Sequence, residues 1–253
     1  MSFMPSIPSS AVGTLNANYL AKCLDLNNDS LSCLQRTFGT PTANGLDKYT
    51  YSIWAKRTGA NAYKTLLGTG YNLGFLSWIE GKIDLYCYSG GRNISMISSA
   101  TYTSTSVWYH FVYVWDRSAT TLRLYVDGTL ISSFNFAPTY PLVGSVSDIN
   151  SAASHIIGAT DLVGSFHHDG KIARACFIEG QALAASDFGQ TVGSTWTSKT
   201  PAELKSLADS GDGNSFFLDF DNGASTTTLG YDKSSHGNNW TLYNLSTSNW
   251  LPA

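Results

Sequence analysis

The sequence predicts an all-β protein, a two-sheet antiparallel β-sandwich of the jelly-roll type with one or two short helices. Charged residues make up 13% of the 253 residues, about half of the ordinary share of roughly 25%. Fifteen aspartates stand against three glutamates, and because Asp favours turns and Glu favours helices, this imbalance indicates many turns and little helix. Short alternating segments between Gly, Asn and Ser clusters are typical of a sandwich.

The chain divides into three segments by its patterning. Residues 1–20 form an arm containing Ser and Pro, a candidate docking segment that packs only where a partner or the domain offers a surface. Residues 21–190 carry the alternating segments expected to build the sandwich. Residues 191–253 form a C-terminal extension, with a short helix and a strand expected to complete the sandwich.

Three strand signals are the clearest. Residues 49–56 (YTYSIWAK) alternate between two faces, as in a half-buried strand. Residues 107–115 (VWYHFVYVW) are apolar on both faces, which predicts a strand that is covered on both sides or central in a sheet. In residues 122–131 (LRLYVDGTLI), Asp127-Gly128 supplies the positive φ that a two-residue hairpin turn requires.

The remaining elements are shorter. Further strands are expected over residues 83–88, 155–158, 171–178 and 215–220. Thr200 is a candidate helix cap, Pro201 takes the first helical position and Glu203 completes a capping box. These residues predict a helix that runs to about residue 208.

The four cysteines lack the paired spacing of a zinc site. Cys23 and Cys33 flank a turn-forming run, and a hairpin centred on Asn28 would place them opposite each other. Their Cβ atoms would then lie about 4.5–5.5 Å apart, which makes the pair a disulfide candidate. Two reduced thiols side by side are the favoured interpretation, because the cytosol is reducing.

Charge and hydropathy exclude two classes of partner. The net charge is −3 and the sequence has no basic run, so nucleic acid is not an expected partner. No apolar stretch reaches the roughly 20 residues that span a bilayer, so membrane insertion is not expected. Residues 1–13 do not resemble a secretory signal, which leads us to expect a protein kept in the cytosol until it is released.

Several segments follow the motif order of a known family. Residues 51–56 (YSIWAK) resemble its W-x-K strand, and residues 108–116 (WYHFVYVWD) its W-H-x-V strand. Residues 122–128 (LRLYVDG) are similar to its L-x-L-Y-V-D-G hairpin, and HIIG at 155–158 and GKIA at 170–173 to its later strands. The chain thus resembles the laminin-G-like and concanavalin A-like lectin domains, which implies the same sandwich.

Two further segments resemble virion proteins of tailed bacteriophages: residues 177–189, with FIEGQAL and DFG, and residues 217–240, with FLDF and DKSSHGNNW. With the sandwich motifs, the resemblance covers roughly residues 20–245. It implies a virion structural protein assembled in the host cytoplasm, a head decoration or a component of a tail fibre or spike. Its expected partners are other virion proteins and further copies of itself, in a homo-oligomer such as a trimer.

The sequence offers little for catalysis, and we do not expect an enzyme. Glycoside hydrolases of this architecture need two carboxylates about 5–10 Å apart, and Glu80 with Asp84 forms only a loose candidate pair. His110 lies within an aromatic strand, as a packed core histidine does. No G-x-S-x-G nucleophile motif is present.

No metal or other cofactor is expected, with calcium as the open alternative. His167 and His168 are adjacent, and neighbouring strand residues point to opposite faces, so a solvated loop is the favoured interpretation. Residues 209–214 (DSGDGN) resemble a calcium loop but lack acidic ligands at alternate positions and a closing Glu. An ordinary Asp/Gly turn is therefore expected there.

Aromatic and arginine side chains predicted to face outward are the candidate ligand-binding residues, for a glycan or for a subunit interface. They are Trp78, Tyr86, Tyr88, Arg92, Arg123 and Tyr125. The interface interpretation is favoured, so an inert particle component is the leading hypothesis. A receptor-binding lectin that recognises host surface glycans is the alternative, and a glycan-degrading enzyme ranks third.

Overall fold

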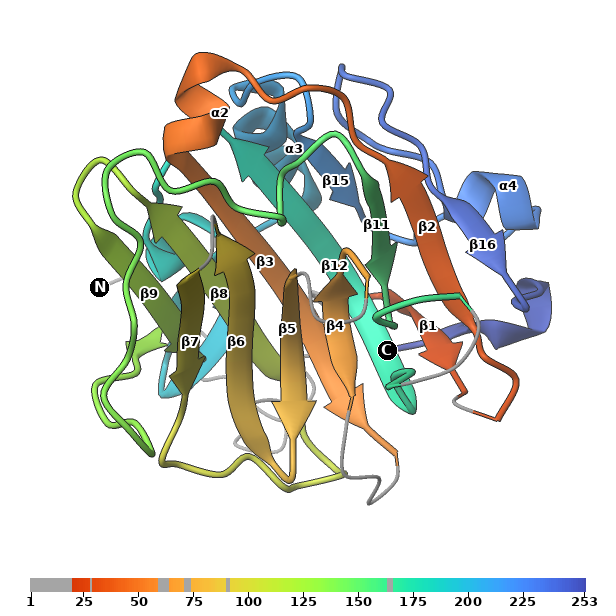
Figure 1. Ribbon diagram of the computed structural model, residues 1–253. Coiled ribbons are helices and arrows are strands. Elements are labelled where there is room, and N and C mark those ends of the chain that lie inside the picture. The colour runs from red at the N-terminus through yellow and green to blue at the C-terminus, as the bar shows by residue number, and fades with distance from the viewer. Residues whose placement is uncertain (1–19, 28, 59–63, 71–73, 90–91, 163–165) are drawn as a thin grey trace, which may run out of the picture.

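The computed structural model describes six stretches of the chain: residues 20–27, 29–58, 64–70, 74–89, 92–162 and 166–253. Across them, two antiparallel sheets face each other and enclose the main hydrophobic core (Figure 1). The expected all-β sandwich with few short helices is confirmed. Residues 1–19 of the N-terminal arm lie outside the described stretches, and Leu20 is buried beside Cys23 and Trp54. No helix in the described stretches is long and apolar enough to cross a membrane.

The larger sheet has eight strands in the order β10-β9-β8-β3-β12-β1-β17, and β15 also pairs with β12. The strands are β1 (Lys22–Leu26), β3 (Lys48–Arg57), β8 (Tyr109–Asp116), β9 (Thr121–Val126), β10 (Thr129–Leu130), β12 (Gly170–Glu179), β15 (Phe216–Leu218) and β17 (Trp250–Pro252). Asp127 and Gly128 join β9 to β10 with φ angles of 47° and 78°, which confirms the predicted hairpin turn. A Cβ atom at Gly128 would lie 2.6 Å from the Trp196 ring, so close packing also requires glycine there.

The smaller sheet has seven strands in the order β16-β2-β11-β4-β5-β6-β7. The strands are β2 (Cys33–Thr37), β4 (Thr65–Gly68), β5 (Gly74–Ile79), β6 (Lys82–Ser89), β7 (Arg92–Ile97), β11 (Ser154–Ile157) and β16 (Thr241–Tyr243). The connection after β10 runs beside β7, where the backbone N–H groups of Asn135 and Thr139 donate to Ile97 and Ser95. This connection therefore pairs with a strand edge that would otherwise be open.

β8 is buried on both faces, as its sequence predicts. Phe111, Tyr113 and Trp115 point into the core between the sheets. Val112 and Val114 point the other way, into a second apolar cluster on the outer face of the eight-stranded sheet. A strand with apolar residues in both phases thus lies between two hydrophobic layers.

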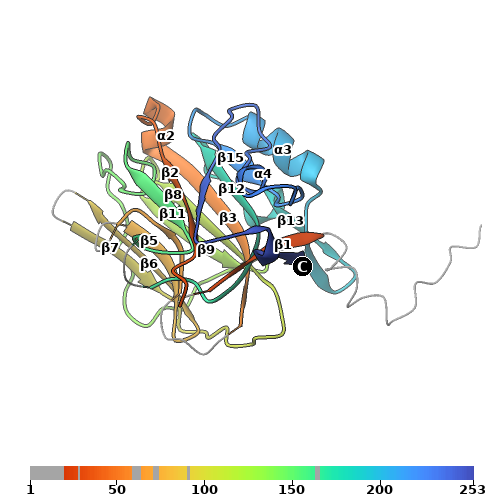
Figure 2. The same cartoon turned by 90° about the vertical axis from the view of Figure 1, so that its right-hand side faces the viewer.

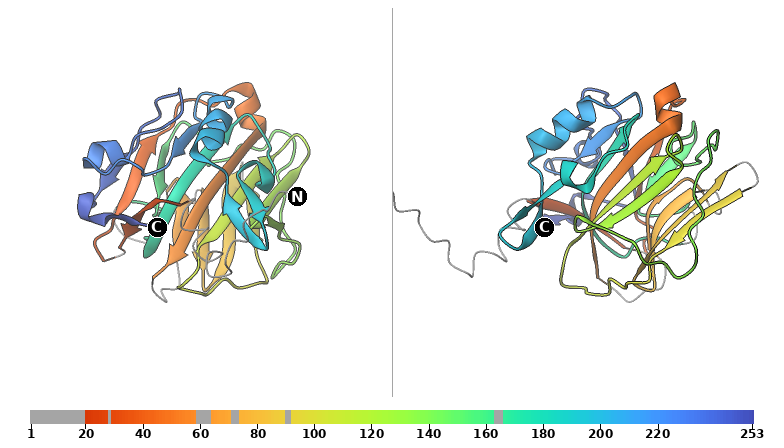
Figure 3. Two further views of the ribbon diagram at one scale, coloured as in Figure 1. Left: turned by 180° about the vertical axis from the view of Figure 1, so that it is seen from behind. Right: turned by 90° about the vertical axis from the view of Figure 1, so that its left-hand side faces the viewer.

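C-terminal residues cover that outer face (Figures 2 and 3). The covering elements are η2 (Ala185–Asp187), β13 (Gly189–Val192), β14 (Thr195–Ser198) and α3 (Pro201–Asp209); the other short helices are α2 (Ala43–Asp47), α4 (Thr226–Leu229) and η3 (Thr247–Asn249). Thr200 caps α3, and its capping box with Glu203 forms as predicted. Leu204 and Ala208 on α3 pack into the outer cluster.

His110 ties the β13–β14 hairpin to the sheet beneath it. The Trp196 indole N–H donates to His110 Nδ1 at 2.9 Å, and His110 Nε2 lies 2.8 Å from Ser52 Oγ. Because an indole only donates, Nδ1 must accept, and the proton of the neutral ring lies on Nε2. Complete burial lowers the pKa of His110 to about 3, so the ring stays neutral at ordinary pH.

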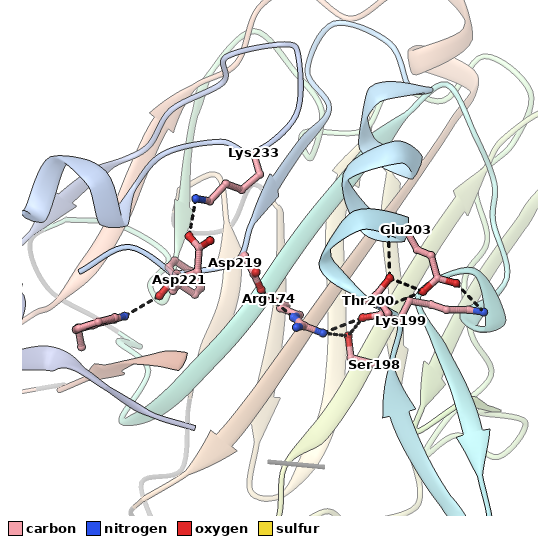
Figure 4. A network of polar contacts seen from close by, with 10 residues as sticks. Arg174, Ser198, Lys199, Thr200, Glu203, Asp219, Asp221 and Lys233 are labelled. Atoms are coloured by element: carbon pink, nitrogen blue, oxygen red, sulfur yellow. Dashed lines mark hydrogen bonds and ion pairs between the residues drawn. The ribbon is translucent and has the colours of Figure 1, made fainter. Parts of the chain in front are cut away.

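Arg174 fastens the C-terminal segment to the sandwich (Figure 4). It lies at a bulge in β12, where the register with β3 shifts between Ala173 and Ala175, and its φ is 47°. Arg174 Nε donates to Asp219 Oδ1 at 2.8 Å, and Nη1 donates to Ser198 Oγ and to the Lys199 carbonyl, each at 2.8 Å. The buried Arg174 guanidinium at this bulge thus contacts two separate stretches of the C-terminal extension, one at Ser198 and Lys199 and one at Asp219.

The predicted hairpin between Cys23 and Cys33 is wrong. β1 lies in the eight-stranded sheet and β2 in the seven-stranded sheet, so the chain crosses between sheets at this turn. Asn27 organises the crossing, because its Oδ1 accepts from the Asp29 N–H at 2.7 Å and its carbonyl accepts from Ser32. Both cysteines are buried and free, opposite Leu251 and Tyr243 respectively. Burial raises the pKa of the Cys23 thiol to about 11 and that of the Cys33 thiol to about 12.

Candidate functional site

The outer face of the seven-stranded sheet is the candidate site, because C-terminal residues cover the other outer face. In Figure 1 this face points towards the viewer, with β3, β8 and β12 behind it. Directly opposed residues on antiparallel strands point to the same side. The register of β5, β6 and β7 therefore sorts their outward side chains into rows across the sheet.

One row is aromatic. Phe75 on β5 lies opposite Tyr86 on β6, and their rings stack with centroids 5.3 Å apart and an interplanar angle of 22°. The Tyr86 hydroxyl donates to Asn93 Oδ1 on β7 at 2.9 Å. Tyr88 lies opposite Asn93, and 43% of Tyr88 is exposed. These four side chains form an accessible patch, the aromatic patch, that combines flat apolar faces with amide and hydroxyl groups.

The neighbouring row is polar and lies deeper. Thr65 on β4, Ser77 on β5 and Asp84 on β6 are directly opposite one another in register. All three are buried, with 5% of Asp84 and 3% of Ser77 exposed. Thr65 Oγ1, Ser77 Oγ and Asp84 Oδ1 are buried without a hydrogen-bond partner. We call these residues the polar row.

Asp84 is the charged member of the polar row. Burial alone raises the pKa of its carboxyl group to about 7, and no neighbouring cation offsets that effect. A buried carboxyl group without a partner is costly to keep, and such strained polar groups are concentrated at functional sites.

The six residues proposed from the sequence do not form one site. Tyr86 and Tyr88 both lie in the aromatic patch. Arg123 and Tyr125 lie on β9 in the other sheet, where Tyr125 packs against the outer apolar cluster. The side chain of Arg92, which begins β7, lies outside the described part of the structure.

The expectation that Trp78 faces outward is wrong. Trp78 is fully buried between the sheets, where its ring contacts Phe111 edge-on at 5.2 Å. The segment Gly74–Ile79 is apolar in both phases, so alternation alone does not tell which phase faces the core. The structure turns Leu76 and Trp78 inward and Phe75 outward.

Phe75 and the polar row were not among the residues expected from the sequence. The turn that sets their register is Glu80-Gly81, with φ angles of 49° and 83°, a left-handed pair like that of an Asn-Gly hairpin turn. Glu at the first turn position is uncommon, so the hairpin signal was weak. Recognising this turn would have placed Phe75 opposite Tyr86 and Ser77 opposite Asp84.

The residues considered for acid–base or metal chemistry lie elsewhere. Glu80 is exposed in the turn between β5 and β6, apart from the row that holds Asp84. His167 and His168 are fully buried, so the expected solvated loop is wrong, and burial lowers the pKa of His168 to about 3. Among the described residues, no three side chains of His, Cys, Asp or Glu gather closely enough to hold a metal ion.

The loop 209–214, considered for calcium, ties the C-terminal segment to the sandwich. Asp209 pairs with Lys205 at 2.6 Å, and Asp212 accepts from the Thr42 hydroxyl at 2.5 Å. The backbone N–H of Asn214 donates to the buried carboxylate of Glu179 at 2.6 Å. These side chains thus bind protein groups in this structure.

Comparison with known proteins places the chain in a family. The sequence pattern of the concanavalin A-like lectin/glucanases superfamily matches residues 36–187, more than half of the chain. The protein belongs to this superfamily, as its motifs implied. A search of the curated proteins finds no match.

Solved structures resemble this one at low sequence identity. A Bacteroides ovatus protein for which carbohydrate binding is proposed has 15% identity and a TM-score of 0.56, over 88% of this chain. The chain spans only 58% of that protein's length. The CBM40 domain of a Ruminococcus gnavus IT-sialidase, solved with α2,3-sialyllactose, has 15% identity and a TM-score of 0.46, over 66% of this chain and 96% of its own. At these identities the likeness concerns the fold alone.

Proposed function

We propose that the protein is a lectin-like component of a tailed-phage particle, and that it binds a host surface glycan on the aromatic patch. The observation that carries the proposal is the aromatic patch itself, Phe75, Tyr86, Tyr88 and Asn93, on the sheet face that C-terminal residues leave uncovered. The glycan-binding lectin is favoured over the inert particle component, because the aromatic patch is an accessible surface with both apolar and polar groups.

The chemistry of the patch suits a sugar ring. Tyr has an apolar ring face and a polar hydroxyl tip, so Tyr86 and Tyr88 offer both stacking area and hydrogen bonds. Asn93 has a carbonyl that accepts and an amide that donates, which matches the mixed donors and acceptors of sugar hydroxyls. Membership in the concanavalin A-like lectin/glucanases superfamily and the likeness to the Bacteroides ovatus protein support a carbohydrate as the ligand.

Binding without turnover is part of the proposal. Glycoside hydrolysis requires a second carboxyl group about 5–10 Å from the first, across the scissile bond. Glu80 and Asp84, the candidate catalytic pair, do not face a common site, because Glu80 lies in an exposed turn and Asp84 is buried in the polar row. A bound oligosaccharide is therefore expected to be recovered intact.

Replacing Tyr86 with alanine is expected to weaken glycan binding at least tenfold, because the variant loses the central ring of the aromatic patch. A tenfold loss corresponds to about 1.4 kcal/mol, which lies within the roughly 1–3 kcal/mol lost when an aromatic side chain that stacks on a nucleic-acid base is replaced by alanine. The measurement is a glycan array followed by calorimetry with the best ligand. Tyr243→Ala, which removes another exposed tyrosine from strand β16 of the same sheet, is the matched control and should bind normally. Equal affinities of the two variants would refute the patch as the site.

The proposal also assigns the protein to the particle of a tailed phage. It is supported by the similarity of residues 177–189 and 217–240 to virion proteins. Both segments lie where the extension meets the sandwich: Glu179 accepts from the Asn214 N–H, and Phe217 on β15 pairs with Cys176 on β12. Exposed apolar residues in β10 and in the connection that follows it, where Asp148 is the only charged residue, favour association with further copies. They are Leu130, Phe136, Tyr140, Leu142, Val143 and Val146.

Purified particles provide the test of that assignment. Mass spectrometry of phage from a lysate should find this chain in several copies per particle, and gold-labelled antibody should decorate the head or the tail. Its presence only in the soluble fraction would reject the virion assignment and leave glycan binding intact.

A further inference from the structure

The polar row has three acceptors and no partner for them. Thr65 Oγ1, Ser77 Oγ and Asp84 Oδ1 come from three adjacent strands in direct register. Neighbouring strands lie about 4.8 Å apart, so the three side chains lie in one line across the same face of the sheet. Three unpartnered polar atoms side by side indicate a group that supplies several donors at once.

The shape and charge of the row select a small cationic group. With 5% of Asp84 and 3% of Ser77 exposed, these atoms have too little free surface for a whole sugar ring, so only a compact group is expected to contact them. A protonated primary amine carries three N–H donors and no acceptor, which matches one carboxylate and two hydroxyl groups. A calcium ion takes six to eight oxygen ligands, and the row supplies a single carboxylate.

The position of the aromatic patch beside the polar row indicates that the amine belongs to a sugar. Phe75 and Tyr86 lie two residues from Ser77 and Asp84 on the same strands and the same face. Two residues of strand span about 7 Å. An amine nitrogen on a sugar ring lies about 3 Å from the ring centre, and its hydrogen bond to a carboxylate adds about 2.8 Å, so a ring stacked on Tyr86 can bring its amine within hydrogen-bond reach of the Asp84 carboxyl group. An amine attached directly to a sugar ring can therefore enter the polar row while the ring stays on the aromatic patch.

We propose that the glycan recognised on this face contains an amino sugar with a free, protonated amine, and that Asp84, Ser77 and Thr65 bind the ammonium group. This inference rests on the proposed glycan binding and adds the ligand class to it. The ammonium ion supplies the cation that the Asp84 carboxylate lacks. An N-acetylated sugar has neither the charge nor the three donors.

The test compares three oligosaccharides that differ only at one ring position. Calorimetry at pH 7 measures the affinities of a glucosamine trimer, an N-acetylglucosamine trimer and a glucose trimer for the full chain. The glucosamine trimer is expected to bind roughly tenfold more tightly than the other two, because charge-assisted hydrogen bonds are about twice as strong as neutral ones. Asp84→Asn should bring the three affinities within about threefold of one another, since asparagine keeps the shape and removes the charge.

Each other outcome decides a different claim. Asp29→Asn removes the same charge from an exposed turn and must keep the preference. The unmodified protein could bind all three sugars equally well while Tyr86→Ala still loses binding. That result would mean that the polar row holds only water, so the inference would fail and the proposed function would survive. Failure of every glycan to bind overturns both. A lysine-containing tripeptide that binds more tightly than the glucosamine trimer would assign the row to a protein partner and overturn the inference.

Discussion

Replacing Arg174 with alanine is expected to lower the free energy of unfolding by about 3–5 kcal/mol. Only 5% of the Arg174 side chain and 11% of the Asp219 side chain are exposed. The variant would leave the Asp219 carboxylate buried without its cation, and an uncompensated buried charge is strongly destabilising. It would also remove the hydrogen bonds to Ser198 and Lys199 that hold the extension (Figure 4).

Urea unfolding followed by tryptophan fluorescence measures the effect. Arg174→Lys keeps the charge but lacks the fork that reaches both partners, so its loss should be intermediate. The matched control is Lys205→Ala, which breaks an exposed ion pair with Asp209 and should cost less than about 1 kcal/mol. A free energy for Arg174→Ala within 1 kcal/mol of that of the unmodified protein would show that Arg174 does not hold the C-terminal segment to the sandwich.

Asp84→Asn is expected to stabilise the protein above pH 7 and to have little effect near pH 4. Burial raises the pKa of Asp84 from 3.8 to about 7. A carboxyl group whose pKa is higher in the folded state contributes stability at low pH and loses it as the pH rises from about 4 to 7. With about 1.4 kcal/mol for each pH unit, this loss approaches about 4 kcal/mol, and asparagine does not suffer it.

The measurement is the difference in unfolding free energy between Asp84→Asn and the unmodified protein at pH 4 and at pH 8. Buried histidines such as His110, His155 and His168 also titrate, since burial lowers their pKa values, but both proteins contain them and their contributions cancel. The difference should rise by up to about 4 kcal/mol in favour of the variant. A difference that stays constant between the two pH values would show that Asp84 is not a strained carboxyl group.

The fold could be predicted because its signals are local. Apolar residues in both phases of β8 predicted a strand between two layers, and the two layers exist. Asp127-Gly128 predicted a hairpin, and Thr200 with Glu203 predicted a helix start; both depend on a few adjacent residues. Backbone conformation at a turn or cap is fixed by its own side chains, so the sequence carries it directly.

The site could be predicted only in part, because it depends on pairing between strands. Tyr86 and Tyr88 were expected to face outward and do so, but the phase of β5 was not predicted, so Trp78 was expected on the surface and Phe75 was missed. The Cys23–Cys33 hairpin failed for a related reason. A turn sequence does not say whether the chain folds back on itself or crosses to the opposite sheet. Arg174 was also missed, since a bulge arises from the register of two strands and not from one segment.

A crystal structure with the best ligand from the glycan array would test the central claim most directly. The account predicts a sugar ring stacked on Tyr86, on the outer face of β5, β6 and β7, with a substituent that points towards Asp84. A sugar bound beside Tyr125 on the opposite sheet, or at the strand ends away from β6, would contradict it.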